Sequence, residues 1–375
     1  MIIVLGAGLI GLAIAYELAK RGARVRVIEA RVPGRAASWA GAGMLAPFTE
    51  AMPAGPLAAL CAESLGRYPA FVRDVRERSG VDARLALGGI LEAAFDAAGE
   101  ARLRAHVRAL EARGVAARYL EREEVQLLEP ALSTAARGAS LSPSEGAVDN
   151  RRLGRALHAA CLAAGVRIDV EAGDVALEAD ERRVLGVRTA AGFLAADAVV
   201  NATGSWAAQL AGVPARVRAP VFPVKGQMLA LAMPRGLVRH VIWAPGIYLV
   251  PRDDGRLLAG ATVERAGFDV RVTARALREL LAAALTAMPA LEELAVAETW
   301  AGLRPGTADG LPYLGYTALG GYLLATGHYR NGILLTPATA TAIADLLEGR
   351  SRPDLAAFSP LRTQEALAGA TKGTS

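Results

Sequence analysis

The 375-residue chain has few cysteines, lysines and histidines, and no apolar run near the roughly 20 residues that cross a bilayer. Its two cysteines, Cys61 and Cys161, form no CxxC pattern and have no histidine at metal-ligand spacing. This argues against a disulfide framework and a zinc site. We therefore expect no metal, no membrane segment and a reducing, cytoplasmic location. An apolar strand expected at residues 2–5 leaves no room for a secretion signal.

The formal charge of +5 comes almost entirely from arginine, because Lys20, Lys225 and Lys372 are the only lysines. The arginines are interspersed with acids, as in residues 100–124, where we expect ion pairs instead of a basic face. Nucleic-acid binding is therefore not indicated. With 53% apolar residues and enough length for about two domains, the chain is typical of a globular α/β protein.

What the chain does have is a glycine motif at its start. An apolar strand runs into Gly6-x-Gly8-x-x-Gly11 and then into a helical pattern. In a dinucleotide-binding turn these glycines permit the bend, the approach of a pyrophosphate and close helix packing. The helix N-terminus favours the pyrophosphate charge. A second strand at 25–28 ends in Glu29, a carboxylate that can bind ribose hydroxyls. The alternative is a glycine-rich turn beside a surface glutamate.

Small residues fill 34–47, which predicts backbone lying against a cofactor; the alternative is a plain loop. Elsewhere the apolar spacing predicts helices and alternation predicts strands. The helices are expected at 57–80, 97–113, 150–165, 271–288 and 336–347. The strands are expected at 166–170, 196–200, 221–224, 227–231, 247–250, 257–261 and 322–325. The residues from 364 onward are expected to be a disordered tail.

Nucleotide-fold elements thus appear at the start of the chain and again near 150–205 and 322–347. The economical interpretation is one nucleotide domain assembled from three stretches, with a second, β-rich domain inserted in pieces. The cofactor domain is expected to comprise residues 1–80, 148–215 and 300–375. The substrate domain is expected to comprise residues 81–147 and 216–299.

Eight sequence blocks carry a resemblance to a known family. They are GAGLIG at 6–11, SWAGAGML at 38–45, NATG at 201–204, PVKGQ at 223–227, YLVPR at 248–252, GAT at 260–262, WAGLRPGT at 300–307 and GHYRNGILL at 327–335. In this order they resemble the D-amino-acid oxidase superfamily of FAD-dependent amine oxidoreductases, most closely the glycine oxidases of thiamine biosynthesis. The resemblance implies a two-domain α/β (α+β) fold, in which a Rossmann-like FAD domain built from discontinuous segments adjoins an antiparallel β-sheet substrate domain.

The resemblance also implies a set of FAD contacts. They are Gly6, Gly8, Leu9, Ile10, Gly11, Glu29, Ala30, Ala37, Ser38, Ala42, Gly43, Met44, Val175, Gly204, Gly327, His328, Tyr329, Arg330, Asn331, Gly332, Ile333 and Leu334. The last loop opens a helix, so its N–H groups and the positive helix end would face the flavin N1 and O2, where negative charge collects on reduction. Neither cysteine lies in this loop, so we expect non-covalent FAD.

The substrate groups implied by the resemblance are Arg304, Tyr248 and Arg330. Arg304 matches the family's carboxylate arginine, because a guanidinium meets a carboxylate with two parallel hydrogen bonds. Tyr248 matches its hydroxyl partner, and Arg330 a second arginine at the site edge. The alternatives are a surface ion pair for Arg304, a plain strand residue for Tyr248 and a brace of the flavin loop for Arg330. Gly246 and Val263 replace a family histidine and methionine, which leaves the side-chain preference open.

The implied reaction oxidises glycine, and also sarcosine and small D-amino acids, by hydride transfer from Cα to flavin N5. Molecular oxygen would reoxidise the flavin and give hydrogen peroxide. No catalytic group beyond the flavin is required if the substrate binds as the neutral amine. Lys225 is either a cation near the flavin or a strand residue at the domain seam. One alternative function is a D-amino-acid dehydrogenase that passes electrons to a quinone, and another is a non-catalytic flavoprotein subunit. A homo-oligomer, either dimer or tetramer, is expected from the family.

Overall fold

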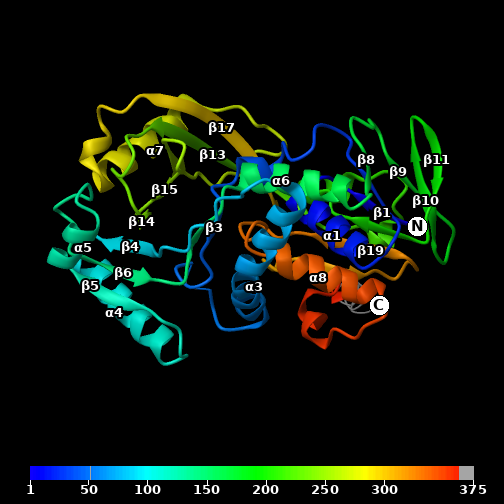
Figure 1. The fold of residues 1–375 in the computed structure, drawn as a ribbon, viewed down its shortest axis with the longest axis horizontal. Coiled ribbons are helices and arrows are strands. Elements are labelled where there is room, and N and C mark those ends of the chain that lie inside the picture. Colours follow the sequence, from blue (N-terminus) through cyan, green and yellow to red (C-terminus); the bar gives the residue numbers. More distant parts are fainter. Residues whose placement is uncertain (51, 363–375) are drawn as a thin grey trace, which may run out of the picture.

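The computed structural model describes residues 1–50 and 52–362. The tail expected from residue 364 lies outside these ranges. Two large sheets occupy opposite ends of an elongated molecule (Figure 1). Among the described residues, no helix is long and apolar enough to cross a membrane.

The first sheet has six strands in the order β18-β19-β12-β1-β2-β8, and every neighbouring pair is parallel except β18–β19. Both of its faces are buried, because Val4 and Val27 pack toward the helices while Ile3 and Leu5 pack on the opposite side. Burial on both faces explains why β1 is continuously apolar. The bounds are Ile2–Leu5 (β1), Val25–Ile28 (β2), Arg167–Asp169 (β8), Ala198–Asn201 (β12), Tyr313–Tyr316 (β18) and Tyr322–Thr326 (β19).

Helices cover one face of this sheet, and a small sheet covers the other. Helix α1 packs against α6 and α8, and α3 packs against the same two helices. The small sheet comprises β9 (Ala176–Ala179), β10 (Val184–Thr189) and β11 (Gly192–Ala195). The helix bounds are Leu9–Lys20 (α1), Ala37–Ala40 (α2), Pro56–Ser79 (α3), Ala97–Glu111 (α4), Arg122–Leu128 (α5), Asn150–Ala163 (α6), Ala274–Ala287 (α7) and Thr336–Leu347 (α8). Short 3-10 turns occupy Gly204–Gln209, Ala215–Val217, Pro289–Leu291 and Pro353–Phe358.

The second sheet has eight strands in the order β17-β13-β16-β15-β14-β4-β6-β5. It is antiparallel except between β14 and β4, where two separate stretches of chain meet. The bounds are Ile90–Ala94 (β4), Arg118–Glu121 (β5), Gly138–Ser142 (β6), Phe222–Ala232 (β13), Val241–Ala244 (β14), Ile247–Pro251 (β15), Arg256–Gly260 (β16) and Val296–Gly306 (β17). A two-stranded ribbon, β3 (Met44–Leu45) with β7 (Gly146–Ala147), completes the sheets.

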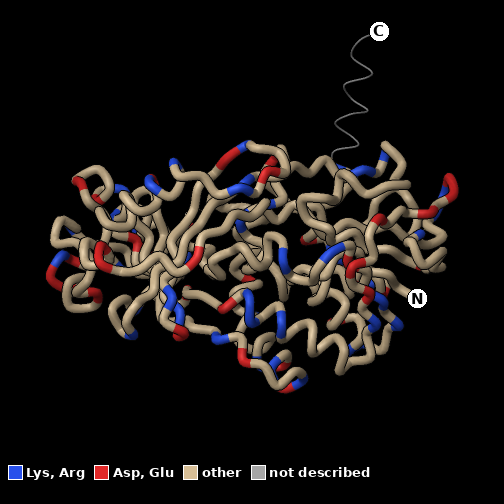
Figure 2. Tube along the Cα trace, turned by 90° about the horizontal axis from the view of Figure 1, so that it is seen from above, with Lys and Arg blue, Asp and Glu red and all other residues tan. Residues whose placement is uncertain are grey.

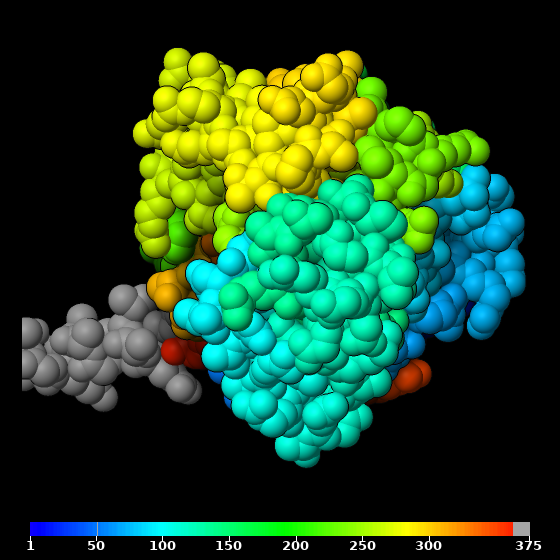
Figure 3. Space-filling model, turned by 90° about the vertical axis from the view of Figure 1, so that its left-hand side faces the viewer, coloured from blue at the N-terminus to red at the C-terminus, as the bar shows by residue number. Residues whose placement is uncertain are grey.

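The two faces of the eight-stranded sheet have different neighbours. One face packs on α7 through residues such as Leu229 and Leu280. The other presents Met228, Tyr248 and Trp300 toward the stretch that follows α2. Figure 3 views the molecule from this end, where the cyan-to-green segment with α4 and α5 lies beside the yellow segment with α7, although the two are far apart in sequence. The second face therefore looks toward the expected cofactor.

Several strands were not predicted, among them β4–β6, β9–β11, β14 and β18, and two further corrections concern the strands nearest the site. The strands expected at 221–224 and 227–231 are one strand, β13, because Lys225 and Gly226 continue its pairing with β17. The sequence analysis also missed β17, which runs across the expected domain boundary at 299/300 and pairs with β13 along its length. The division of the chain into domains stays a prediction.

Charges of both signs are interspersed along the chain (Figure 2). The ion pairs expected in residues 100–124 are confirmed, since Arg104 lies 3.1 Å from Glu100 and 2.8 Å from Glu121. Arg137 also reaches Glu100, at 2.8 Å. These arginines are thus neutralised locally.

The tight approach of helix α1 to strand β1 gives a first prediction. A Cβ at Gly11 would overlap the carbonyl oxygen of Gly6, whereas a Cβ at Gly154, also in a helix, would meet only Leu9 at 3.9 Å. We expect Gly11→Ala to lower the free energy of unfolding and to weaken FAD binding. Gly154→Ala, the matched control, should leave stability unchanged or raise it by about 0.5–1 kcal/mol. Urea denaturation of both variants checks this, and equal stabilities would contradict it.

Candidate active site

The turn between β1 and α1 has the geometry of a dinucleotide-binding turn. Gly6 has φ +98° and Gly8 is the N-cap of α1. In the described part of the chain, no protein group accepts from the N–H groups of Ile10 and Gly11, which lie in the first turn of α1. Glu29, directly after β2, accepts from the Ala7 N–H at 2.8 Å. A carboxylate and free helix N–H groups therefore lie at one turn, as the sequence predicts.

The next stretch, from Ser38 to Met44, is held through its carbonyl groups. Asn150 donates to the Ser38 carbonyl at 2.7 Å, Trp300 to that of Ala40 at 2.9 Å and Arg252 to that of Ala42 at 2.7 Å. Gly43 has φ +73°, and a Cβ there would overlap the carbonyl oxygen of Val148. This stretch is thus fixed against α6 and the eight-stranded sheet, which leaves its other side for a ligand.

The loop from Gly327 to Leu335 shows the same arrangement. Tyr68 of α3 donates to the Ile333 carbonyl at 2.5 Å, and Ser64 donates to that of Leu334 at 2.6 Å. Carbonyl and N–H groups of one peptide point in opposite directions. The N–H groups of Gly332, Ile333 and Leu334 have no acceptor among the described residues. The bond from Tyr68 to the Ile333 carbonyl therefore directs the Leu334 N–H away from α3, whereas the peptide held by Ser64 carries the Leu335 N–H, which bonds to the Asn331 carbonyl at 2.7 Å.

The predicted substrate residues lie together at this loop. Arg304 of β17 lies across Gly226 of β13 and donates to the carbonyls of Thr262 at 3.1 Å and Lys225 at 3.3 Å. Within the described ranges, no carboxylate pairs with Arg304. Tyr248 is buried, and burial raises the pKa of its hydroxyl. The charges of Arg304 and Arg330 lower this pKa, but by less. The fixed guanidinium of Arg304, which has no carboxylate partner among the described residues, therefore lies beside the buried hydroxyl of Tyr248.

Arg330 closes this cluster at its edge. Its guanidinium lies 5.8 Å from the centre of the Trp243 ring, which is 6.0 Å from the ring of Tyr248. Its Nε atom lies 3.8 Å from a carboxylate oxygen of Glu50. Sequence reasoning missed Glu50, since no motif marks it and its partner is 280 positions further along the chain. Only the fold brings this acid to the site.

Other predicted cofactor residues lie around the same region. The ring of His328 is buried against Thr339 of α8, at 3.1 Å, and burial lowers its pKa to about 3, so the ring is neutral. Only the backbone of His328 is left for a cofactor. The carbonyl of Gly204 accepts from Thr326, and Gly327 has φ +79°. Val175 lies just before β9, half-buried beside the first sheet.

The two departures from the family pattern lie near the cluster but outside it. Gly246 forms the exposed turn between β14 and β15, with φ +76°. Val263 is 56% exposed, so it forms no enclosed wall. Lys225 is buried, and its ammonium group lies 3.8 Å from Asp269. These positions leave the carboxylate-binding groups of the cluster unchanged.

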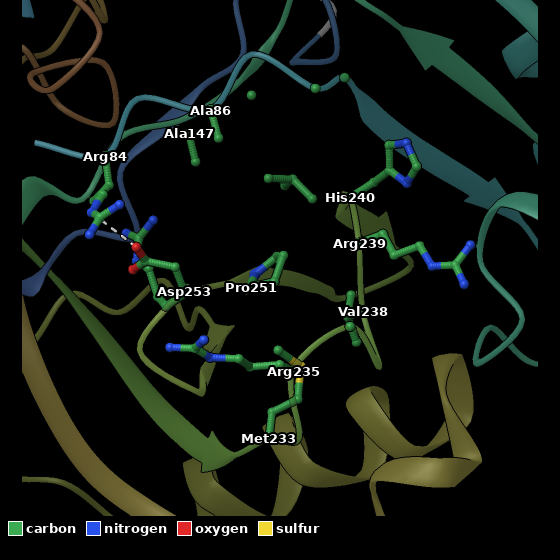
Figure 4. Close-up of a pocket in the computed structure, with 16 residues that line it drawn as sticks. Arg84, Ala86, Ala147, Met233, Arg235, Val238, Arg239, His240, Pro251 and Asp253 are labelled. Atoms are coloured by element: carbon green, nitrogen blue, oxygen red, sulfur yellow. Dashed lines mark ion pairs between the residues drawn. The ribbon is translucent and has the colours of Figure 1, made fainter.

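A cavity of about 570 Å³ adjoins this region from outside (Figure 4). Arg84 points toward Asp253 across its edge, and the two form an ion pair at 3.0 Å. Arg252 lines this cavity and also contacts the Ala42 carbonyl. One buried guanidinium therefore joins the cavity wall to the expected cofactor stretch.

Comparison with known proteins identifies the family of the chain. The model of the FAD dependent oxidoreductase family matches residues 1–346. The chain belongs to this family. It is 37% identical to the glycine oxidase of Geobacillus kaustophilus over 96% of each chain, and the crystal structure of that enzyme matches with a TM-score of 0.91, covering 96% of this chain and 97% of that one. It is 39% identical to the bifunctional protein ThiO/ThiG of Synechocystis over 96% of its own length, but spans only 54% of that longer protein.

As a member of the FAD-dependent oxidoreductases, the chain uses FAD, and its residues fit that cofactor. The first turn of α1 can hold the pyrophosphate, and Glu29 the ribose. The free N–H groups of residues 332–334 can meet the pyrimidine side of the flavin. Burial raises the pKa of both Cys61 and Cys161 to about 12, and neither lies in this loop, which agrees with the expectation of non-covalent binding.

The hydrogen bond from Tyr68 to the loop at residues 327–335 gives a second prediction. Tyr68→Phe leaves the ring in place but removes a donor to the partly buried Ile333 carbonyl, which also accepts from the Thr336 N–H at 3.2 Å. We expect the dissociation constant of FAD to rise about threefold to thirtyfold, the cost of one lost hydrogen bond. Titration of the apoprotein with FAD measures it. The control is Tyr316→Phe, which removes an exposed hydroxyl that donates to Leu346 at 3.3 Å. Equal affinities in the two variants would contradict the role of Tyr68.

Glu145 gives a third prediction, on pH. Its buried carboxylate accepts hydrogen bonds from Phe48 and Thr49, yet burial outweighs them and raises its pKa from 4.5 to about 7. Since the folded pKa is the higher one, ionisation opposes folding, and the stability present at low pH is lost as pH rises toward 7. Relative to Glu145→Gln, the wild type should lose up to about 3 kcal/mol of unfolding free energy between pH 5 and pH 8. Urea denaturation at both values checks this; a constant difference would exclude it.

Proposed function

We propose that the chain is an FAD-dependent glycine oxidase that also accepts sarcosine and small D-amino acids. The observation that carries the proposal is the fixed guanidinium of Arg304, which pairs with no carboxylate in the described ranges and lies beside the buried hydroxyl of Tyr248. This arrangement suits the carboxylate of a small amino acid. The relatives named glycine oxidase, similar over nearly the whole chain, support glycine as that amino acid.

The side chains bind and orient the substrate. Arg304 is held by two carbonyl acceptors, so its remaining N–H groups keep one direction for a carboxylate. Tyr248 keeps its proton at neutral pH, because burial raises its pKa above the ordinary value of 10.0, and it can donate a second hydrogen bond. Bound FAD supplies the acceptor for the hydride of Cα. The protein's contribution is then to fix Cα relative to the flavin and to exclude water.

The proposed products are an imine, which hydrolyses to glyoxylate and ammonia, and hydrogen peroxide from oxygen. With sarcosine the amine product would be methylamine. We further propose a role in forming the thiazole of thiamine, a homo-oligomeric state and a cytoplasmic location. Two relatives of the ThiO/ThiG type, each about twice as long, support the pathway. The buried, free thiols of Cys61 and Cys161 suit a reducing compartment.

The test is anaerobic mixing of FAD-loaded protein with glycine, sarcosine and D-alanine, followed by admission of air. Bleaching of the flavin absorbance by glycine and fast return with peroxide would support the oxidase. Bleaching without fast return would instead support a dehydrogenase that reduces a quinone. No bleaching with any of the three would contradict an amino-acid oxidoreductase and leave a structural role for FAD.

The proposed binding of the substrate carboxylate by Arg304 gives a fourth prediction. Arg304→Lys keeps the charge but loses the second parallel N–H. We expect KM for glycine to rise about tenfold or more, with a smaller change in kcat, because binding of the carboxylate is lost in ground and transition state alike. Steady-state peroxide formation measures both constants. Arg271→Lys, at a side chain that is 86% exposed, is the matched control and should match the wild type. An unchanged KM in Arg304→Lys would remove Arg304 from the site.

A further inference from the structure

Glu50 is an acid of the substrate cluster, where its carboxylate pairs with Arg330. Its side chain is only 17% exposed, and its ion pair with Arg330, at 3.8 Å, is too long for a hydrogen bond. In the part of the chain that the structure describes, no N–H or O–H donates to its carboxylate. Burial raises the pKa of the Glu50 carboxyl, while Arg330 and Arg304 act against that rise, and the charge of Glu50 in turn acts on Tyr248. Its oxygens are not among the sealed, unpaired polar atoms of the described residues, so they are accessible as acceptors for a ligand.

The backbone before Glu50 is held rigidly. The buried carboxylate of Glu145 accepts from the N–H groups of Phe48 and Thr49 and from the hydroxyl of Thr49. On the other side, the ring of His106 lies 2.9 Å from the Phe48 carbonyl oxygen. The Glu50 N–H itself bonds to the Ala46 carbonyl. These bonds fix the backbone of the two residues before Glu50, so its side chain starts from a defined position beside Arg330.

An amino acid brings two charged poles to this cluster. Its carboxylate suits Arg304, but its ammonium group would then lie near two arginines, which repel it. The cluster contains one group that compensates, since Glu50 supplies a negative charge on the side of Arg330. Charge-assisted hydrogen bonds from the ammonium N–H groups would also fill the open acceptor sites of Glu50.

Resting on the proposed function, we propose that Glu50 recognises the amino group of the substrate, so that Arg304 and Glu50 bind the two poles of one small zwitterion. The residue thereby selects amino acids over hydroxy acids of the same size. It also disfavours amino acids with a second carboxylate, which would meet Glu50 as a like charge. The rival interpretation gives Glu50 only a structural role as the partner of Arg330.

The experiment compares glycine with glycolate, which has the same carboxylate and carbon skeleton but a hydroxyl in place of the amine. FAD-loaded wild type, Glu50→Gln and Glu50→Asp are mixed anaerobically with each ligand. The dissociation constant of glycolate is read from the shift of the flavin spectrum, and that of glycine, which reduces the flavin, from the dependence of the reduction rate on glycine concentration. The control is Glu123→Gln, at an exposed glutamate of α5. Retained FAD absorbance and circular dichroism establish that each variant is folded.

In Glu50→Gln we expect the dissociation constant of glycine to rise about tenfold to a hundredfold, while that of glycolate is unchanged or falls. Glu50→Asp keeps the charge and should retain part of the preference. An equal change for both ligands would assign Glu50 a structural role, and an unchanged glycine constant would remove it from the site; either overturns the proposal. The proposed function is tested separately, by reduction of the wild-type flavin with glycine. That result does not depend on how the dissociation constants of the variants compare.

Discussion

The structure depends on one recurring interaction, in which carbonyl groups of the cofactor loops are tied to side chains behind them. Asn150, Trp300 and Arg252 hold the stretch after α2, and Ser64 and Tyr68 hold the loop before α8. Each bond fixes the orientation of a peptide group. In the peptides held through the Ala42 and Ile333 carbonyls, the N–H groups of Gly43 and Leu334 have no acceptor among the described residues, so they are oriented for a ligand before it binds. The donors come from α3, α6, β17 and the residue directly after β15. Binding of FAD therefore draws on the whole fold.

This arrangement also explains why the chain is divided as it is. Strands β1, β12 and β19, which lie side by side, come from the start, middle and end of the sequence. The carboxyl ends of parallel strands share one edge of the sheet, so the three loops that follow them, at residues 6–8, 202–204 and 327–334, also lie together. The eight-stranded sheet then brings Arg304 and Tyr248 to the same place. No contiguous segment could supply both the donors and the substrate groups.

The sequence predicted the elements whose signals are local. Helix α3 was expected at 57–80 and spans Pro56–Ser79, and β15 was expected at 247–250 and spans Ile247–Pro251. The signal fails where the partner is distant. Strand β17 contains a proline and two glycines, and it is a strand because β13 pairs with it. Glu50 could not be predicted for the same reason, since only its ion pair with the distant Arg330 places it at the site. The motif residues were found from family resemblance; acids that act on them were not.

The charges of the site limit which groups can change with pH. His328 is held neutral by burial, which lowers its pKa to about 3, and Tyr248 keeps its proton because burial raises its pKa. Two potential proton donors are thereby fixed in one state across the physiological range. Glu50 differs, because burial raises its pKa while Arg330 and Arg304 oppose that rise. Burial outweighs the two arginines, so the pKa of Glu50 stays above its ordinary value and a further positive charge beside it would lower that pKa. An incoming ammonium adds to the arginines, and so favours the ionised carboxylate at the moment when that charge is needed for binding.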